Sequence, residues 1–165
     1  CPVSIETAPF IIKDARKAGL GLILAGDTWD DVSIAERAGD AATDVYFSCF
    51  FDASDTNNAA AAEFVEGFKA WINEDSQRLE DNGGTEEISS VTPCGYDAYM
   101  AVYNAIKNAG SADGEAIRNA LAELNVPGLV TGDLSFDENG DAIKTYVAIK
   151  TYKDGGTVFY DSYNG

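Results

Sequence analysis

A carboxylate, a hydroxyl and an indole follow one another at Asp27, Thr28 and Trp29, directly after Gly26 and the apolar run of residues 20–25. The run predicts a buried strand, and in an open α/β sheet the loop that leaves the carboxyl end of a strand is where ligands bind. An aspartate beside a glycine and an indole suits a cationic or zwitterionic small molecule. The carboxylate pairs with an ammonium, the ring packs on the apolar part, and the glycine allows close approach. The same residues also fit a strand followed by an acidic turn that caps the next helix, so both interpretations stay open.

The sequence offers little for covalent catalysis. Histidine is absent, which excludes a Ser-His-Asp triad, a Cys-His pair and a histidine-bearing zinc site. Paired carboxylates for glycoside hydrolysis exist in any chain this acidic, so their abundance indicates nothing. The glycine-rich pieces at residues 82–84 and 155–156 lack the lysine, serine and threonine of a phosphate-binding loop. We therefore predict that the chain is not an enzyme and carries no cofactor.

The three cysteines, Cys1, Cys49 and Cys94, show no C-x-x-C spacing, which argues against a zinc ribbon or thioredoxin-type chemistry. Cys49 and Cys94 could form a disulfide in an oxidising compartment, and two buried free thiols are the alternative. Cys1 could carry a lipid, but the usual flexible polar tether does not follow it. We expect instead that it marks where a longer chain was cut.

Residues 137–141 (DENGD) have the acids and the glycine of a calcium-binding loop. They lack the ligand spacing of an EF-hand loop, and a strand is expected where the exiting helix should begin. Asn139-Gly140 between alternating strands is the strongest short-range hairpin signal in the sequence. We predict a hairpin turn here and no metal site.

The charge balance excludes some partners. The formal net charge is −17, and the 11 lysines and arginines are scattered singly, so the chain lacks the basic face that a nucleic-acid binder needs. Anionic membrane surfaces are disfavoured for the same reason. A hydrophobic content of 45% is typical of a globular protein, and 165 residues suffice for one ordinary domain or two small half-lobes. The longest apolar run is far shorter than a membrane span, and the first residues lack the pattern of a signal peptide.

The predicted elements begin in the order helix, strand, helix, strand. The helices are expected at residues 7–18 and 32–38, where capping residues precede them and a glycine follows. The strands are expected at residues 20–25 and 45–51, the latter rich in β-branched and aromatic residues. Short connections between these elements predict a parallel sheet with right-handed crossovers.

A polar connector at residues 52–58 is a candidate domain crossing. Residues 59–79 carry apolar side chains at helical spacing, which predicts a helix with Trp71 in the core rather than on a binding surface. After an acidic loop, two more helices are expected at residues 95–109 and 113–124.

The end of the chain predicts β-structure. Residues 129–136 alternate like a strand, residues 142–152 predict another, and a turn at residues 154–156 leads into a final strand at residues 157–163. The helical first part and this last part together predict an α/β protein.

Several segments resemble the type I periplasmic solute-binding proteins of the leucine/isoleucine/valine-binding family, the extracytoplasmic receptors of ABC amino-acid importers. The segments are FIIKDARKAGL, LILAGDTWD, AGDAATDVYF, GYDAYMAVYNAI and TGDLSFDENGD. The last two are the most specific, because a helix that opens with GYDA is followed by a TGxxxFDxxGD hairpin. The likeness covers nearly the whole chain, but it matches only the C-terminal half of the family.

The resemblance implies an α/β fold, the parallel-sheet sandwich of the type I periplasmic binding protein class, with parts of both lobes of a hinged clamp. Residues 1–52 and 133–165 would form the second-lobe portion, and residues 53–132 would hold the first-lobe helices and the hinge crossings. The crossings are expected near residues 51–56 and 128–132.

The resemblance also implies which residues touch the ligand. Asp27 matches the acid that receives the α-ammonium of the ligand, and many relatives have a tyrosine where Ile5 stands. The family's carboxylate-binding serine and threonine lie in the half that has no counterpart here. The implied second-lobe contacts are Asp27, Thr28, Trp29, Ser4, Ile5 and Glu6.

By this resemblance the chain is a fragment of an extracytoplasmic solute-binding receptor, periplasmic or a cell-surface lipoprotein. It would bind an amino acid, branched-chain or related, or an amide by hinge closure, and deliver it to an ABC permease in the membrane. We expect it to be a monomer when full length. The alternatives are a ligand-sensing regulatory domain of the same fold, a hydrolase that uses acid pairs, and a structural fragment with no ligand.

Overall fold

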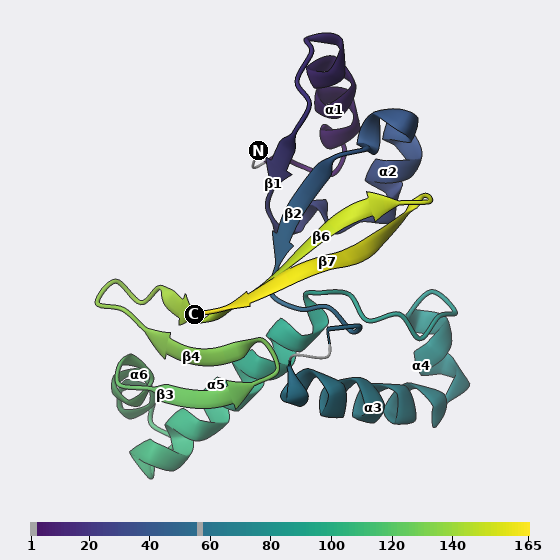
Figure 1. The fold of residues 1–165 in the computed structure, drawn as a ribbon. Helices are drawn as coiled ribbons and strands as arrows, with labels where there is room; N and C mark the ends of the chain where they lie inside the picture. The colour runs from purple at the N-terminus through teal and green to yellow at the C-terminus, as the bar shows by residue number, and fades with distance from the viewer. Residues whose placement is uncertain (1–2, 56–57) are drawn as a thin grey trace.

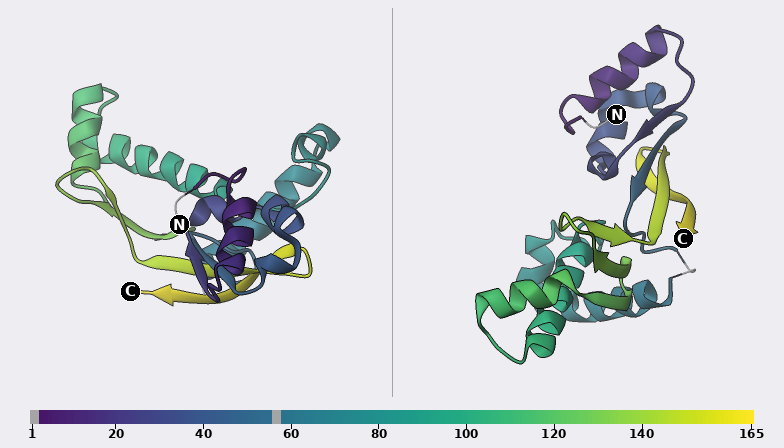
Figure 2. Two further views of the ribbon diagram at one scale, coloured as in Figure 1. Left: turned by 90° about the horizontal axis from the view of Figure 1, so that it is seen from above. Right: turned by 90° about the vertical axis from the view of Figure 1, so that its left-hand side faces the viewer.

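The computed structural model describes residues 3–55 and 58–165, which form two lobes (Figure 1). The lobe that we call the second holds a four-stranded sheet with the helices α1 and α2. The first lobe holds the helices α3 to α6 and a three-stranded sheet. Seen from the side, the two lobes lie one above the other (Figure 2, right).

The sheet of the second lobe has the strand order β1-β2-β6-β7. β1 and β2 are parallel, as predicted, whereas β6 is antiparallel to both β2 and β7. The predicted α/β class is confirmed, with a mixed rather than a purely parallel sheet. The strands are β1 (Ile23–Ala25), β2 (Val45–Cys49), β6 (Tyr146–Lys153) and β7 (Gly156–Asn164).

Two predicted helices, α1 (Ala8–Lys17) and α2 (Val32–Ala38), pack on one face of this sheet. The carboxylate of Asp31 caps α2 by accepting a hydrogen bond from the backbone N–H of Ser33 at 2.8 Å. Alternate residues of β2 turn inward to meet the helices, so the core of this lobe lies between helices and sheet.

The strand predicted at residues 20–25 is shorter than expected and largely uncovered. Only Ile23 is buried, while Leu20, Leu22 and Leu24 are 57%, 60% and 64% exposed. β1 is the edge strand of the sheet, and β2 is the only described strand that pairs with it. Its exposure therefore follows from its position at the edge of the sheet.

The first lobe contains the two helices predicted after the acidic loop. The second of them begins at Asp113, whose carboxylate accepts hydrogen bonds from the N–H groups of Glu115 and Ala116, both at 3.0 Å. The single helix predicted over residues 59–79 is wrong, since Asp75 caps a separate helix by accepting from Gln77 N at 2.9 Å. The helices are α3 (Ala59–Asn73), α4 (Ser76–Asp81), α5 (Thr92–Ala109) and α6 (Gly114–Ala122).

The strands of the first lobe are β3 (Asn125–Leu129), β4 (Gly132–Phe136) and β5 (Ala142–Lys144). Leu129 pairs with Gly132, so the chain reverses there and the single strand predicted over residues 129–136 is wrong. The crossing predicted near residues 128–132 stays a prediction, and in this structure the chain turns back within one sheet at these residues. Gly132 has φ +88°, and a Cβ on it would lie 2.8 Å from Cβ of Tyr146, so this position requires glycine.

The strand predicted over residues 142–152 is divided at Thr145 between the two sheets. β5 pairs with β4 in the first lobe, whereas β6 pairs with β2 and β7 in the second. The lobe boundary at residue 133 stays a prediction, but in this structure the return to the second lobe lies at Thr145. The predicted hairpin turn between β4 and β5 is confirmed, with Gly140 at φ +86°.

The other described connection leaves β2 for α3, at the crossing predicted for residues 51–56. Phe51 is buried there against Ala61 and Val130 of the first lobe. Thr56 and the first residue, Cys1, lie outside the described residues. Within residues 3–55 and 58–165, no helix combines the length and the apolar character needed to cross a membrane.

Candidate ligand-binding site

The predicted acid lies in the loop after β1. Asp27–Trp29 form a short 3₁₀ helix, η1, in which Trp29 N donates to Gly26 O at 3.1 Å and Asp30 N donates to Asp27 O at 3.0 Å. Asp27 and Thr28 are exposed, and the Asp27 carboxylate forms no hydrogen bond or ion pair with any described residue. Within the part of the chain that the structure describes, this carboxylate is therefore available to a cation.

Trp29 has a different role from the predicted one. Its side chain is fully buried in the core of the second lobe, and its indole N–H donates to Val3 O at 3.1 Å. The Tyr152 hydroxyl donates to Trp29 O at 2.6 Å. The indole thus fixes η1 to the core of the second lobe, and it does not offer a surface to a ligand.

The second predicted contact segment precedes α1. Its backbone is tied to η1 through the bond between Trp29 and Val3. Ser4 and Glu6 are exposed, while Ile5 packs partly against the core. The pKa of Glu6 is lowered by hydrogen bonds from its own backbone N–H and from Ser4. The structure therefore brings the two predicted parts of the site together, with Ser4 and Glu6 rather than Ile5 on the surface.

The negative charge of Asp27 acts on groups in both lobes. Cys94 belongs to the first turn of α5, in the first lobe, and burial raises the pKa of its thiol. Lys144 opposes this rise, whereas the negative charges of Asp97 and Asp27 add to it. Asp27 also contributes to the raised pKa of Cys49, at the end of β2. Asp27 therefore disfavours the thiolate form of one cysteine in each lobe.

A buried ion cluster beside this loop was not predicted. The Lys150 ammonium lies 2.8 Å from Asp30 Oδ1 and 3.3 Å from Asp52 Oδ2. All three side chains are close to nine-tenths buried or more. The alternation of residues in β6 could have indicated a buried charge, because it places Lys150 on the same inward face as Ala148 and Tyr152.

A second buried acid, Asp97 on α5, was also not predicted. Its carboxylate accepts hydrogen bonds from Val130 N at 3.1 Å, from Thr131 N at 2.8 Å and from the Thr131 hydroxyl at 2.6 Å. The Lys144 ammonium lies 3.9 Å from Asp97 Oδ2, and its buried Nζ has no hydrogen-bond partner within residues 3–55 and 58–165. Burial lowers the pKa of Lys144, and the charge of Asp97 opposes this. Asp97 therefore holds the tight turn between β3 and β4 against α5.

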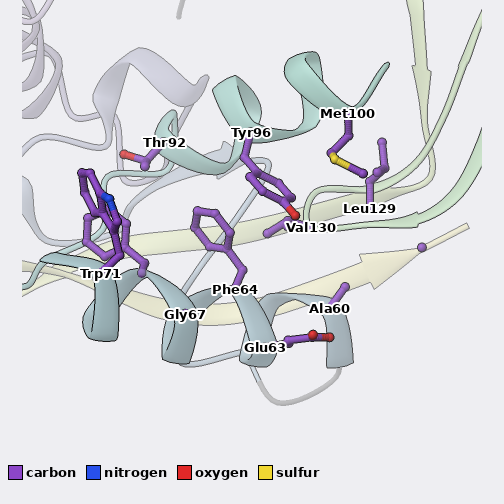
Figure 3. A pocket seen from close by; sticks show the side chains of 12 residues that line it. Ala60, Glu63, Phe64, Gly67, Trp71, Thr92, Tyr96, Met100, Leu129 and Val130 are labelled. Atoms are coloured by element: carbon purple, nitrogen blue, oxygen red, sulfur yellow. The ribbon is translucent and has the colours of Figure 1, made fainter. Parts of the chain in front are cut away.

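An apolar groove of about 770 Å³ lies between α3 and α5 within the first lobe (Figure 3). Phe64 and Tyr96 face each other across it, with ring centroids 5.3 Å apart. The prediction that Trp71 is part of the core is wrong, because Trp71 lines this groove, is 49% exposed and contacts the Arg78 guanidinium. Helical periodicity identified the apolar face correctly, but the described residues do not cover that face.

The turn was predicted to be a hairpin rather than a metal loop, and in it the carboxylate of Asp137 binds backbone N–H groups of the turn itself. Asp137 Oδ1 accepts hydrogen bonds from Asn139 N at 2.8 Å and from Asp141 N at 2.9 Å. The backbone bond from Asp141 is the main cause of the lowered pKa of Asp137. Within the described parts of the chain, no group of three or more histidine, cysteine, aspartate or glutamate residues is placed to hold a metal ion.

Cys49 and Cys94 are both free thiols. Burial, followed by the charge of Asp30, raises the pKa of Cys49 from 9.0 to about 12, so its thiolate is about a thousandfold rarer at neutral pH. We expect iodoacetamide at pH 8 to modify Cys94 at least about tenfold faster than Cys49 in the native protein, as measured by peptide mass spectrometry. In urea the two rates should become equal, and equal rates in the native state would contradict the burial of Cys49.

The raised pKa of Cys49 also makes the stability of the fold depend on pH. Between pH 9.0 and about 12 the unfolded chain loses the Cys49 proton and the folded chain keeps it. This contribution to stability is complete below pH 9.0 and is lost as the pH rises through that interval.

Comparison with known proteins supports the fold. The model of a family described as periplasmic binding protein matches residues 3–157. A leucine-binding protein, LivK, from Thermotoga maritima is 32% identical with a TM-score of 0.73, and the match covers 99% of this chain and 43% of that one. The comparison with curated protein sequences finds no match.

Two further solved structures share the fold at lower identity. A substrate-binding protein of an ABC transporter from Desulfitobacterium hafniense, in complex with Leu, is 21% identical with a TM-score of 0.62, covering 93% of this chain and 40% of that one. A solute-binding protein from Rhodopseudomonas palustris, in complex with benzoate, is 22% identical with a TM-score of 0.58, covering 92% and 39%.

The two-lobed α/β arrangement is that of the type I periplasmic binding proteins. The chain belongs to the periplasmic binding protein family, a family of proteins that bind solutes and are not enzymes. It spans less than half the length of the solved relatives described above.

Proposed function

We propose that this chain is part of an extracytoplasmic solute-binding receptor of an ABC transporter, in which Asp27 receives the ammonium group of an amino acid. The observation that carries the proposal is an exposed carboxylate without a partner among the described residues, at the exit of a strand, whose charge acts on Cys94 of the other lobe. Such a group pairs with an ammonium once a ligand excludes water from the space around it.

The chemistry of the loop favours one class of solute. The 32% identical LivK is described as a leucine-binding protein, and a more distant relative was solved with Leu. Benzoate, bound by another distant relative, carries only a negative charge, which Asp27 would repel. We therefore favour a branched-chain or related amino acid, or an amide, over an aromatic acid.

Capture would proceed by closure of the two lobes. A ligand shifts the lobes toward the closed state only by binding that state more tightly. Asp27 supplies such a preference, because its interaction with an ammonium strengthens when closure removes water. The closed receptor would then deliver the solute to a membrane permease, outside the cytoplasm, as a periplasmic protein or a cell-surface lipoprotein.

Substitution of Asp27 tests the site. In the full-length protein that carries this chain, we expect Asp27→Ala to weaken leucine binding more than about tenfold, or about 1.4 kcal/mol, in isothermal titration calorimetry. Glu36→Gln removes one negative charge from an exposed position on α2 and serves as the matched control, with unchanged affinity. An Asp27→Ala protein that binds leucine as tightly as the wild type would remove Asp27 from the site.

The solute itself can be found without assuming leucine. A ligand that binds only the native state raises its thermal midpoint, so a screen of amino acids and small amides ranks the candidates. We expect the hits to carry an ammonium or an amide, and a hit list of purely anionic solutes would contradict the assignment of Asp27.

A further inference from the structure

Three charged side chains from three separate stretches of the chain meet at one buried point beside η1. We call Lys150, Asp30 and Asp52 the hinge cluster. The Lys150 ammonium lies 2.8 Å and 3.0 Å from the two carboxylate oxygens of Asp30, and 3.3 Å from Asp52 Oδ2. Charges this far removed from water persist only when their mutual geometry is good, so the three groups hold each other firmly in place.

Each member of the hinge cluster controls a different part of the fold. Asp30 ends η1, and its N–H donates to Asp27 O at 3.0 Å, so its position determines that of the candidate ligand loop. Asp52 lies in the connection from β2 to α3, where its carboxylate also accepts from Ser54 N at 2.8 Å. Lys150 lies in β6, the strand that follows the other described connection.

The hinge cluster lies at the boundary between the lobes. A hollow of about 300 Å³ beside it is walled by Asp30 and Lys150 on one side and by Asn82 and Glu87 of the first lobe on the other. Burial alone would lower the pKa of Lys150, but the hydrogen bond and charge of Asp30 and the charge of Asp52 outweigh it. Lys150 therefore stays charged throughout the physiological range.

We propose that Lys150 is a positioning residue that couples the ligand loop to the hinge, because its ammonium joins Asp30 of the loop to Asp52 of the first connection. A movement of the lobes that displaces Asp52 then pulls on the loop that carries Asp27, and a ligand that fixes the loop restrains the hinge. The role of Asp27 in ligand binding rests on the proposed function, whereas the coupling between the loop and the hinge does not.

The test follows hydrogen exchange at individual backbone amides by NMR, in the full-length protein that carries this chain. Trp29, Asp30 and Asp31 report on the loop, because their N–H groups are bonded within it, and Asp55 N, bonded to Asp52 O at 3.2 Å, reports on the connection. Coupling predicts that Asp52→Asn speeds exchange of the loop amides at least threefold, although Asp52 itself touches none of them. Asp30→Asn should in turn speed exchange of Asp55.

Three further variants, all at lysines of β6, complete the set. Lys150→Met should speed exchange in both segments at least tenfold, and Lys150→Arg should restore much of the protection because it keeps the charge. Lys153→Met removes a lysine from the exposed end of the same strand and should change neither segment. If Lys150→Met fails to fold, the two Asp→Asn variants still decide the question.

The outcomes separate the coupling from the proposed function. Loop amides that exchange at the wild-type rate in Asp52→Asn would overturn the coupling, because a merely structural ion cluster changes only the segment that is mutated. Calorimetry with leucine is the second measurement, and coupling predicts at least fivefold weaker binding in Lys150→Met with recovery in Lys150→Arg. If the variants show the exchange effects but the wild-type protein binds no leucine, the coupling is retained and leucine is refuted as the solute.

Discussion

Replacement of Asp97 by alanine is expected to lower the free energy of unfolding by about 3–5 kcal/mol, the range for breaking a buried charged pair. Asp97 is only 3% exposed, and its carboxylate accepts three hydrogen bonds from the turn between β3 and β4. Its removal leaves those donors unsatisfied and the Lys144 ammonium without its counter-charge. Urea denaturation followed by circular dichroism measures the change.

Further variants serve as controls for the urea denaturation of Asp97→Ala. Asn108→Ala, at an exposed position on the same helix, should change stability by less than about 0.5 kcal/mol. Combining Asp97→Ala with Lys144→Met removes the unpaired ammonium, so the double variant should be more stable than the sum of the two single changes. Simple additivity would mean that the two groups do not interact.

Replacement of Trp29 by alanine should cost about 3–5 kcal/mol, as expected for a fully buried aromatic side chain. The loss combines an empty space in the second-lobe core with the hydrogen bond to Val3 O. Trp71→Ala is the matched control, because Trp71 is the other tryptophan and is 49% exposed; it should cost about 1 kcal/mol. Equal losses for the two variants would contradict the placement of Trp29 as the anchor of η1.

Local signals in the sequence predicted much of the fold. The helices that follow Asp31 and Asp113 and the turn at Asn139-Gly140 were predicted, because capping and turn residues act on backbone groups within a few residues. The division at Thr145 was not predicted, since membership of a sheet depends on partners far away in the chain. The reversal at Val130 and Thr131 was missed because the alternation continues on both sides of it.

The candidate site was predicted in part. Asp27 and Thr28 were predicted from their position after β1, and both are exposed there. Trp29 is buried, because an indole next to an apolar core gains more from packing than from exposure. Asp97 and Lys150 stood at inward positions of a helix and a strand, and a charged residue in such a place is itself a signal. Their partners, however, become neighbours only in the folded chain.

The uncovered aromatic groove between α3 and α5 has a consequence for the colloidal behaviour of this chain. Apolar surface such as Trp71 and Tyr96, 49% and 47% exposed, attracts further copies, whereas a net charge of −17 repels them. In about 0.1 M salt the repulsion extends only ~10 Å, while the attraction between apolar surfaces persists. Dilute buffers therefore keep the molecules apart, and concentrated salt drives them to aggregate.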